Sequence, residues 1–333
     1  MTAEVPSKPI HLALIGCGTI AKTHLEAIAK VSRIKLCLIQ DIRETEGLET
    51  AKQNHCDFTK NSEDVFRGKD IDAVLICAPP ATHFAFAKQA LEAGKHLLCE
   101  KPFTTCLRDA EEIKKISEKS DRSVMMASKF RFVKDVIAAK KFVESGIIGD
   151  VILSEVIFCS VVNMENRWNS DPTIAGGGVL IDNGSHAVDV IRYLVGPIQS
   201  VYAQAGKKTQ KSAVEDTARL HFETKDHIIG MVDLSWSLYK HTPNFVNIFG
   251  TRGTIEVGWA QSLIWDAKEK TSKVFGQGYQ KLDAFVKQME HFADCIQGKV
   301  KPILGIDDAI ESVRVIETAY TSIREKKWLE VLS

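Results

Sequence analysis

The stretch Ile10-His11-Leu12-Ala13-Leu14-Ile15-Gly16-Cys17-Gly18-Thr19-Ile20-Ala21 decides the fold of the first part of the chain. An apolar-rich run of six residues, the pattern of a buried strand, leads through a turn with two glycines into a helical segment at 21–30. Further strands are expected at 34–39, 72–77, 96–99 and 123–127, with helical segments at 44–53, 83–93 and 107–119. Because apolar strands that alternate with helices form a parallel sheet covered on both faces, residues 1–128 are predicted to be one α/β domain.

The pattern changes after residue 128. A helix at 133–145, a strand at 150–158 and a helix that reaches Val195 are followed by strands without intervening helices, at 198–204, 216–222, 228–238, 244–249, 253–257 and 263–266. Two helices, at 281–296 and 307–326, close the chain. Successive strands favour an antiparallel sheet, so residues 129–333 are predicted to be a second, α+β domain.

Composition excludes several classes of partner. The 333 residues carry 43 Lys and Arg against 43 Asp and Glu, so nothing favours nucleic acid or an anionic membrane surface. No run of 18 apolar residues occurs, and the segment from Met1 to Pro9 lacks the apolar core of a signal peptide. A soluble, cytoplasmic protein is expected.

Cysteine and histidine spacing gives no sign of a metal. The eight cysteines contain no Cys-x-x-Cys pair, and several lie inside apolar runs, as small buried side chains of a reducing compartment do. The ten histidines form no His-x-x-x-His pair. We therefore expect no metal site and no disulfide.

The glycine turn has the spacing of a dinucleotide site. Gly16 and Gly18, with Thr19 and Ile20 at the start of the helix, match Gly-x-Gly-x-x-Ala, in which glycines allow a pyrophosphate to approach a helix N-terminus. Asp41 ends the second strand, 25 residues after Gly16. An acid there accepts hydrogen bonds from ribose hydroxyls and repels a 2′-phosphate, which favours NAD over NADP. Arg43 keeps NADP open, because an arginine in that turn can pair with a 2′-phosphate.

Two more strand ends are expected at the same edge of the sheet, where ligands of parallel sheets bind. One strand runs into Cys77-Ala78-Pro79-Pro80, with His83 opening the next helix. The other runs into Glu100-Lys101-Pro102, which places a lysine just beyond a buried strand. The candidates for cofactor contact in these two segments are Cys77, Ala78, Pro79, Pro80, His83, Glu100 and Lys101.

A third motif lies in the second domain, where Gly176-Gly177-Gly178 precedes Asp182 and His186. Residues four apart share one face of a helix, so the carboxylate and the imidazole would point the same way. The glycines would let another group approach the helix start closely. Such a pair also occurs on ordinary helices that have no catalytic role. The rest of the chain decides whether this pair is an acid–base site or part of an ordinary helix.

Together these segments resemble the Gfo/Idh/MocA family of glucose-fructose oxidoreductases and inositol dehydrogenases, over the whole chain and in the same order. The resemblance rests on the glycine turn, Ala78-Pro79-Pro80-x-x-His83, Glu100-Lys101-Pro102 and Asp182-x-Gly184-x-His186-x-x-Asp189. It implies a Rossmann domain, then a domain with a large open sheet through which copies associate as a dimer or tetramer. It also implies that Lys101, Asp182 and His186 form the catalytic group and bind substrate, with either Lys101 or His186 taking the hydroxyl proton first.

The substrate is expected to be a sugar. The pocket candidates, rich in amide, guanidinium and aromatic groups that suit hydroxyls and rings, are Arg131, Asn163, Arg167, Trp168 and Asn169. Trp168 is also a candidate for contact with the cofactor. The resemblance is nearest to nucleotide-sugar 3-dehydrogenases acting on UDP-N-acetylglucosamine for lipid A or surface-polysaccharide precursors, with Arg131 or Arg167 at the diphosphate. A free sugar or inositol dehydrogenase is the alternative, and a non-catalytic NAD-binding sensor is a third.

Overall fold

The computed structural model describes residues 8–332, so the expectation drawn from residues 1–7 lies outside the described residues. The described chain divides into two compact units. The first consists of residues 8–103, 108–127 and 285–309, and the second of residues 104–107, 128–284 and 310–332. The chain passes from the first unit to the second between residues 127 and 128, one residue before the expected boundary. The return of residues 285–309 to the first unit was not expected.

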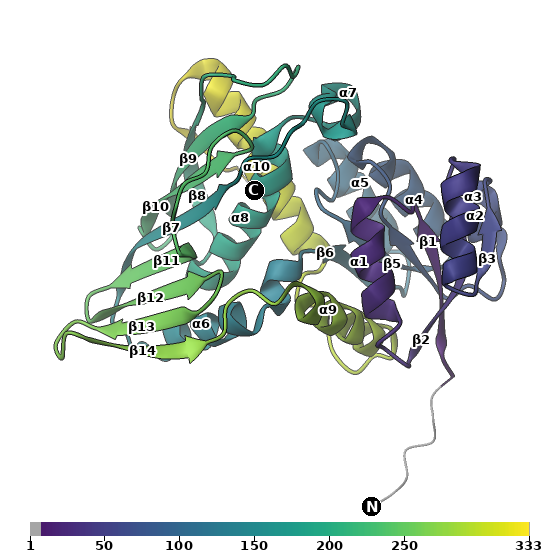
Figure 1. Ribbon diagram of the computed structural model, residues 1–333, viewed down its shortest axis with the longest axis horizontal. Helices are drawn as coiled ribbons and strands as arrows, with labels where there is room; N and C mark the ends of the chain where they lie inside the picture. The colour runs from purple at the N-terminus through teal and green to yellow at the C-terminus, as the bar shows by residue number, and fades with distance from the viewer. Residues whose placement is uncertain (1–7, 333) are drawn as a thin grey trace, which may run out of the picture. The chain divides into compact units, whose positions relative to one another are not determined.

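The first unit is built on six parallel strands in the order β3-β2-β1-β4-β5-β6 (Figure 1). Their bounds are β1 Ile10–Ile15, β2 Ile34–Gln40, β3 Asp57–Thr59, β4 Ala73–Ile76, β5 His96–Glu100 and β6 Val124–Ala127. Side chains of the central strands, such as Leu12, Leu75 and Leu97, have no exposed surface. Apolar strands buried on both faces explain why the parallel sheet could be predicted.

Helices connect these strands. They are α1 Thr19–Ile28, α2 Glu44–Gln53, α3 Ser62–Arg67, α4 His83–Glu92 and α5 Leu107–Ser117, with a 3₁₀ turn at Pro80–Thr82. α1, α2 and α3 contact β2, and α4 contacts β4 and β5. β3 and α3 were not predicted, because a three-residue edge strand and a polar six-residue helix carry too little periodicity to detect.

Helix α9, Lys281–Ile296, shows why residues 285–309 return to the first unit. The ring of Phe285 meets the edge of His24 in α1 at 4.8 Å between centroids, and Arg33 pairs with Asp294. Further on, the carbonyl of Leu304 accepts a hydrogen bond from Met126 of β6. These partners are more than 150 residues apart in sequence, so no local pattern predicts them.

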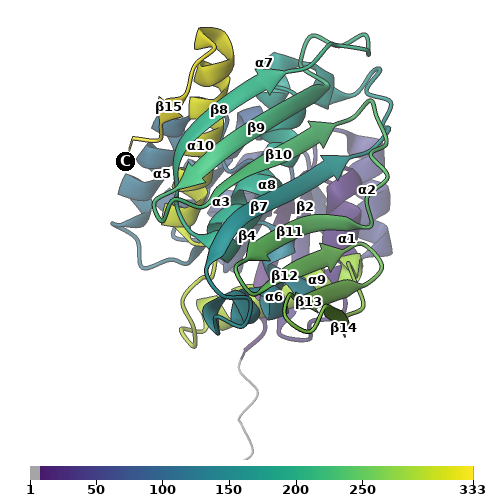
Figure 2. The same ribbon diagram turned by 90° about the vertical axis from the view of Figure 1, so that its left-hand side faces the viewer.

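The second unit is built on nine strands in the order β14-β13-β12-β11-β7-β10-β9-β8-β15 (Figure 2). Their bounds are β7 Val151–Cys159, β8 Ile198–Ala205, β9 Thr217–Thr224, β10 Ile229–Ser235, β11 Asn244–Gly250, β12 Gly253–Gly258, β13 Ser262–Asp266, β14 Thr271–Gly276 and β15 Leu329–Glu330. Every pair is antiparallel except β7 with β10. The predicted fold class is confirmed. β14 and β15, whose residues are largely exposed, were not predicted.

Helix α8, Val179–Val195, lies behind this sheet in Figure 2 and contacts β7, β9 and β10. The other helices of the unit are α6 Lys134–Glu144, α7 Pro172–Ala175 and α10 Ile306–Glu325, with 3₁₀ turns at Lys129–Phe132 and Trp168–Ser170. The core between α8 and the sheet is apolar: Val188, Leu220 and Val232 have no exposed surface. α8 is therefore a rigid support for the side chains on its remaining face.

Candidate functional site

The two glycines of the first turn have different roles. Gly16 has a φ of +85°, and a Cβ there would lie 2.8 Å from the backbone nitrogen of Ala78, so the protein itself requires glycine at this position. Gly18 has an ordinary φ of −68°, and a Cβ on it would meet no atom within 4 Å. No contact among residues 8–332 requires Gly18 to be glycine, and the space beside it within this range is open.

That open space lies at the N-terminus of α1. Gly18 is the N-cap of this ten-residue helix, and it has no side chain that could cap the first amide N–H groups. Thr19 is exposed and Ile20 half-buried. Unpaired amides, a helix dipole and a position without a side chain together fit a phosphate group. The predicted pyrophosphate position therefore has the required geometry.

Asp41, immediately after β2, is bound within the protein on both carboxylate oxygens. Its Oδ2 accepts hydrogen bonds from the Cys17 amide at 2.8 Å and from Arg43 Nη2 at 2.9 Å, and its Oδ1 accepts from Arg43 Nε at 3.1 Å. Burial opposes ionisation, but the hydrogen bonds from Arg43 and Cys17 outweigh it and hold the pKa of Asp41 well below its usual range. Arg43 therefore forms an ion pair with Asp41, and its charge is already compensated before any 2′-phosphate binds.

His83 joins the two other strand-end loops. Its Nδ1 lies 2.8 Å from the carbonyl oxygen of Pro102, and its Nε2 lies 2.8 Å from that of Ala78. The ring is 1% exposed, and burial lowers its pKa against the opposing effect of these hydrogen bonds. His83 was predicted to contact cofactor, but both ring nitrogens face main-chain carbonyls. Its geometry is that of a residue that holds the loops in place.

Lys101 is held at its backbone by neighbouring groups. The Lys101 amide donates to Glu100 Oε2 at 3.1 Å, and Glu100 Oε1 lies 2.7 Å from Nε2 of the buried His24. The Lys101–Pro102 peptide bond is cis, and the Lys101 side chain is half-buried. Glu100 is 7% exposed, so it supports this loop from within. Cys77 and Pro80 are likewise buried, and Ala78 and Pro79 half-buried.

In the second unit, α8 carries Asp182 in its first turn and His186 one turn later. Asp182 is half-buried and His186 is 6% exposed. The ring of Phe130 meets His186 edge-on at 5.1 Å between centroids, and Lys129 Nζ lies 3.4 Å from His186 Nε2. Within the second unit, His186 thus lies beside the amine of Lys129.

Lys129 was not among the predicted site residues. It follows β6 by two positions, and a lysine just beyond a buried strand is the same signal that pointed to Lys101. Its distance from His186 depends on how the 3₁₀ turn at Lys129–Phe132 contacts α8, which spacing does not show.

Arg131 does not have the exposure that contact with a diphosphate requires. It is 4% exposed, and its Nε and Nη2 donate to Oδ1 of Asp189 at 2.8 and 2.7 Å. Asp189 has no exposed surface, and the guanidinium lies 5.2 Å from the centroid of the Tyr193 ring. A buried ion pair already satisfies this guanidinium within the protein, which argues against the expected contact of Arg131 with a diphosphate.

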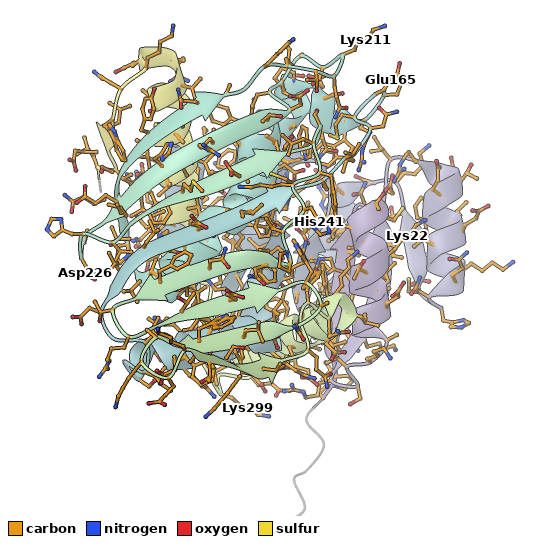
Figure 3. The ribbon with its side chains drawn as sticks, turned by 60° about the vertical axis from the view of Figure 1, so that its left-hand side comes forward. Lys22, Glu165, Lys211, Asp226, His241 and Lys299 are labelled. Carbon is orange, nitrogen blue, oxygen red and sulfur yellow. The ribbon has the colours of Figure 1, made fainter. Side chains whose placement is uncertain are left out.

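The remaining pocket candidates lie on one loop that joins β7 to α7. Asn163 and Arg167 are exposed, Trp168 is 45% exposed, and Asn169 is 8% exposed. Gln210 joins this loop to the β8–β9 loop: its Oε1 accepts from the Met164 amide at 2.9 Å, and its Nε2 donates to the carbonyl of Val162 at 2.9 Å. Figure 3 shows Glu165 and Lys211, from these two loops, at the same end of the sheet.

Among residues 8–332, no three His, Cys, Asp or Glu side chains are grouped so as to hold a metal ion, and each of the eight cysteines has a free thiol. No helix in this range is both long enough and apolar enough to span a membrane.

Comparison with known proteins matches both halves of the chain to one family. Residues 10–128 match the oxidoreductase family model with an NAD-binding Rossmann fold, and residues 136–256 match the GFO/IDH/MocA C-terminal domain. An uncharacterised oxidoreductase of Bacillus subtilis, YrbE, is 27% identical over 95% of both chains. Myo-inositol 2-dehydrogenase of Thermotoga maritima is 23% identical over 96% of this chain and 97% of that one.

Among solved structures, levoglucosan dehydrogenase in complex with NADH superimposes with a TM-score of 0.92 at 20% identity, over 98% of this chain and 100% of that one. This likeness shows that the fold is shared. The two family matches lie in the expected order and carry the glycine turn, the Glu100-Lys101-Pro102 loop and the α8 pair. The chain therefore belongs to the Gfo/Idh/MocA family and is an NAD(P)-dependent oxidoreductase.

Proposed function

We propose that this protein oxidises a secondary alcohol of a free sugar or polyol to a ketone, with NAD as the hydride acceptor. The observation that carries the proposal is the placement of His186, a buried imidazole on a rigid helix with an amine 3.4 Å from its Nε2. An imidazole titrates near physiological pH and suits the removal of a hydroxyl proton. The relatives named for myo-inositol and levoglucosan act on small polyhydroxylated molecules, which supports this substrate class.

The cofactor would be held by the first unit. The Gly18 position leaves room for the pyrophosphate at the α1 N-terminus, and the ionised Asp41 at the end of β2 would repel a 2′-phosphate. The nicotinamide, when bound, supplies a two-electron acceptor for hydride. Because Asp41 neutralises Arg43, we expect NAD to bind more tightly than NADP.

The acid–base work is assigned to Lys101, Asp182 and His186. The hydroxyl proton passes to His186 or Lys101 as the C–H bond breaks, and the C=O double bond forms from the O–H electron pair. Where His186 takes the proton, Lys101 as an ammonium would stabilise the negative charge that develops on the oxygen; where Lys101 takes it, Lys101 acts as the neutral amine. Asp182 would orient the imidazole and accept a hydrogen bond from a substrate hydroxyl. Lys101 belongs to the first unit and the other two to the second, so their meeting in one site is part of this proposal.

The structure of the second unit favours a free sugar over a nucleotide sugar. A diphosphate needs a cation with exposed donors, and Arg131 is buried against Asp189. Arg167 remains exposed on the β7–α7 loop, with Trp168 beside it, and it is the residue to test for a nucleotide sugar.

The first experiment measures NADH formation at 340 nm with myo-inositol, levoglucosan, glucose, N-acetylglucosamine and UDP-N-acetylglucosamine, in wild type and in His186→Ala. His227→Ala is the matched control, because that histidine is exposed and pairs only locally with Glu223. Turnover of a free polyol that His186→Ala abolishes supports the proposal. If the enzyme oxidises only UDP-N-acetylglucosamine, and Arg167→Ala lowers that rate, then the substrate is a nucleotide sugar and not a free sugar. NAD binding without turnover of any compound would favour a sensor.

Self-association through the sheet is also proposed. The face of the sheet opposite α8 carries Leu153 and Ile229 on the neighbouring strands β7 and β10, and Tyr202 on β8. A second copy would bury this face as a dimer or tetramer. Light scattering after size-exclusion chromatography tests it, with Ile229→Lys, at a 54% exposed residue, as the disrupting variant.

A further inference from the structure

The N-terminus of α8 is bound by a residue distant in sequence. The first amide groups of a helix have no partner within the helix, and the first intrahelical bond of α8 runs from Asp182 to the carbonyl of Gly178. Glu215 supplies the missing acceptors. Its Oε1 accepts from the Gly178 amide at 3.1 Å and the Leu180 amide at 3.0 Å, and its main-chain carbonyl accepts from Val179 at 3.0 Å.

Tyr320 of α10 completes this arrangement. Its hydroxyl donates to Glu215 Oε1 at 2.8 Å and accepts from the Gly178 amide at 3.1 Å. Burial, followed by the nearby Glu215, raises the pKa of Tyr320 far above its usual value, so the phenol keeps its proton. The carboxylate lies at the positive end of the helix dipole, where a negative charge is favoured.

The glycine run is explained by these same contacts. A Cβ on Gly177 would lie 2.0 Å from the Tyr320 hydroxyl oxygen, and one on Gly178 would lie 2.1 Å from the Glu215 carbonyl oxygen. Gly176 ends α7 with a φ of +82°. What approaches the start of α8 closely is thus the protein's own Glu215 and Tyr320.

We propose that Glu215 and Tyr320 are a positioning pair, which fixes α8 along its axis and so fixes where Asp182 and His186 stand in the site. Asp182 lies two residues beyond Leu180, whose amide is bound, and His186 lies one turn further. A shift of the helix start is transmitted directly to both side chains, because a helix is stiff over two turns. This inference rests on the catalytic roles proposed for Asp182 and His186.

Tyr320→Phe tests the pair by removing the donor and keeping the ring, and Glu215→Gln tests it by removing the charge. With the substrate that the wild type oxidises, we expect kcat to fall about 10- to 100-fold, the scale of a displacement of about 1 Å. The dissociation constant of NAD should not change, since the pair lies in the other unit. Tyr239→Phe and Glu144→Gln, which remove the same groups at exposed positions of the second unit, are the matched controls.

A readout independent of turnover separates positioning from mere stability. In protein labelled at histidine, the His186 ring signal is assigned with His186→Asn, and its shift and titration are compared among variants by NMR. A changed His186 signal together with lower kcat supports the pair. An unchanged signal and unchanged kcat, with only a lower Tm, overturns it. If the wild type oxidises none of the compounds, the proposed function fails, and the His186 signal alone tests the positioning. A His186 signal that changes in both variants and not in the controls supports the pair. A His186 signal that is unchanged in both variants refutes it.

Discussion

Asp189→Asn is expected to destabilise the second unit strongly, because it would leave Arg131 charged, buried and without its carboxylate partner. Asp189 has no exposed surface and Arg131 only 4%, and two hydrogen bonds of 2.7 and 2.8 Å join them. Hydrogen bonds between charged groups contribute about 1.5–3 kcal/mol each. An amide at position 189 can still accept from Arg131, but as a neutral group it leaves the buried guanidinium charge uncompensated, for which a loss of about 3–5 kcal/mol is expected.

The assay is thermal and urea unfolding followed by far-UV circular dichroism, with calorimetry to resolve the transition. For a unit of this size, the loss corresponds to a decrease in Tm of roughly 6–20 °C. Asp283→Asn is the control. Its pair with Lys134 has both side chains more than half exposed, so the expected cost is at most about 1 kcal/mol.

A third variant separates lost attraction from uncompensated charge. Arg131→Met combined with Asp189→Leu removes both charges and fills the space with apolar groups, and it should be more stable than Asp189→Asn alone. If Asp189→Asn costs no more than Asp283→Asn, then the guanidinium is not committed to Asp189. Arg131 would then return as a candidate for substrate contact.

Three further predictions concern the first unit and the proposed chemistry. Gly18→Ala should leave the Tm of the NAD-free protein unchanged and should weaken NAD binding in a fluorescence titration, whereas Gly16→Ala should lower the Tm itself. An NAD affinity of Gly18→Ala equal to that of the wild type would contradict the assigned phosphate position. Lys101→Ala and His186→Ala should each lower turnover about 100-fold or more with NAD binding retained, and near-normal rates in either would remove its assigned role. The pKa of Asp41 in the folded protein lies below its value of about 4 in the unfolded chain, so its ionised form stabilises the fold fully above about pH 4 and progressively less below it. The Tm should therefore fall less between pH 7 and pH 3 in Asp41→Asn than in the wild type.

The sequence by itself determined the order and type of most elements. β1 and α2 have the predicted bounds, and α9 does too, because apolar strands and amphipathic helices carry their period within a few residues. The glycine turn and the Asp182–His186 spacing are equally local, since one depends on backbone freedom and the other on the pitch of a helix. The family followed from these motifs in their order.

Only the tertiary structure decided which of these groups are committed to the protein. Arg131 and His83 were expected to contact ligands because of their residue type and position. In the structure, Arg131 pairs with Asp189, which is 58 residues away, and His83 lies against the carbonyl of Pro102, which is 19 residues away. Spacing along the chain does not show burial, and burial decides whether a charged group is exposed for a ligand or paired within the core. The glycines before α8 show the same limit: the sequence indicated a close approach, and the fold decided that Glu215 and Tyr320 make it.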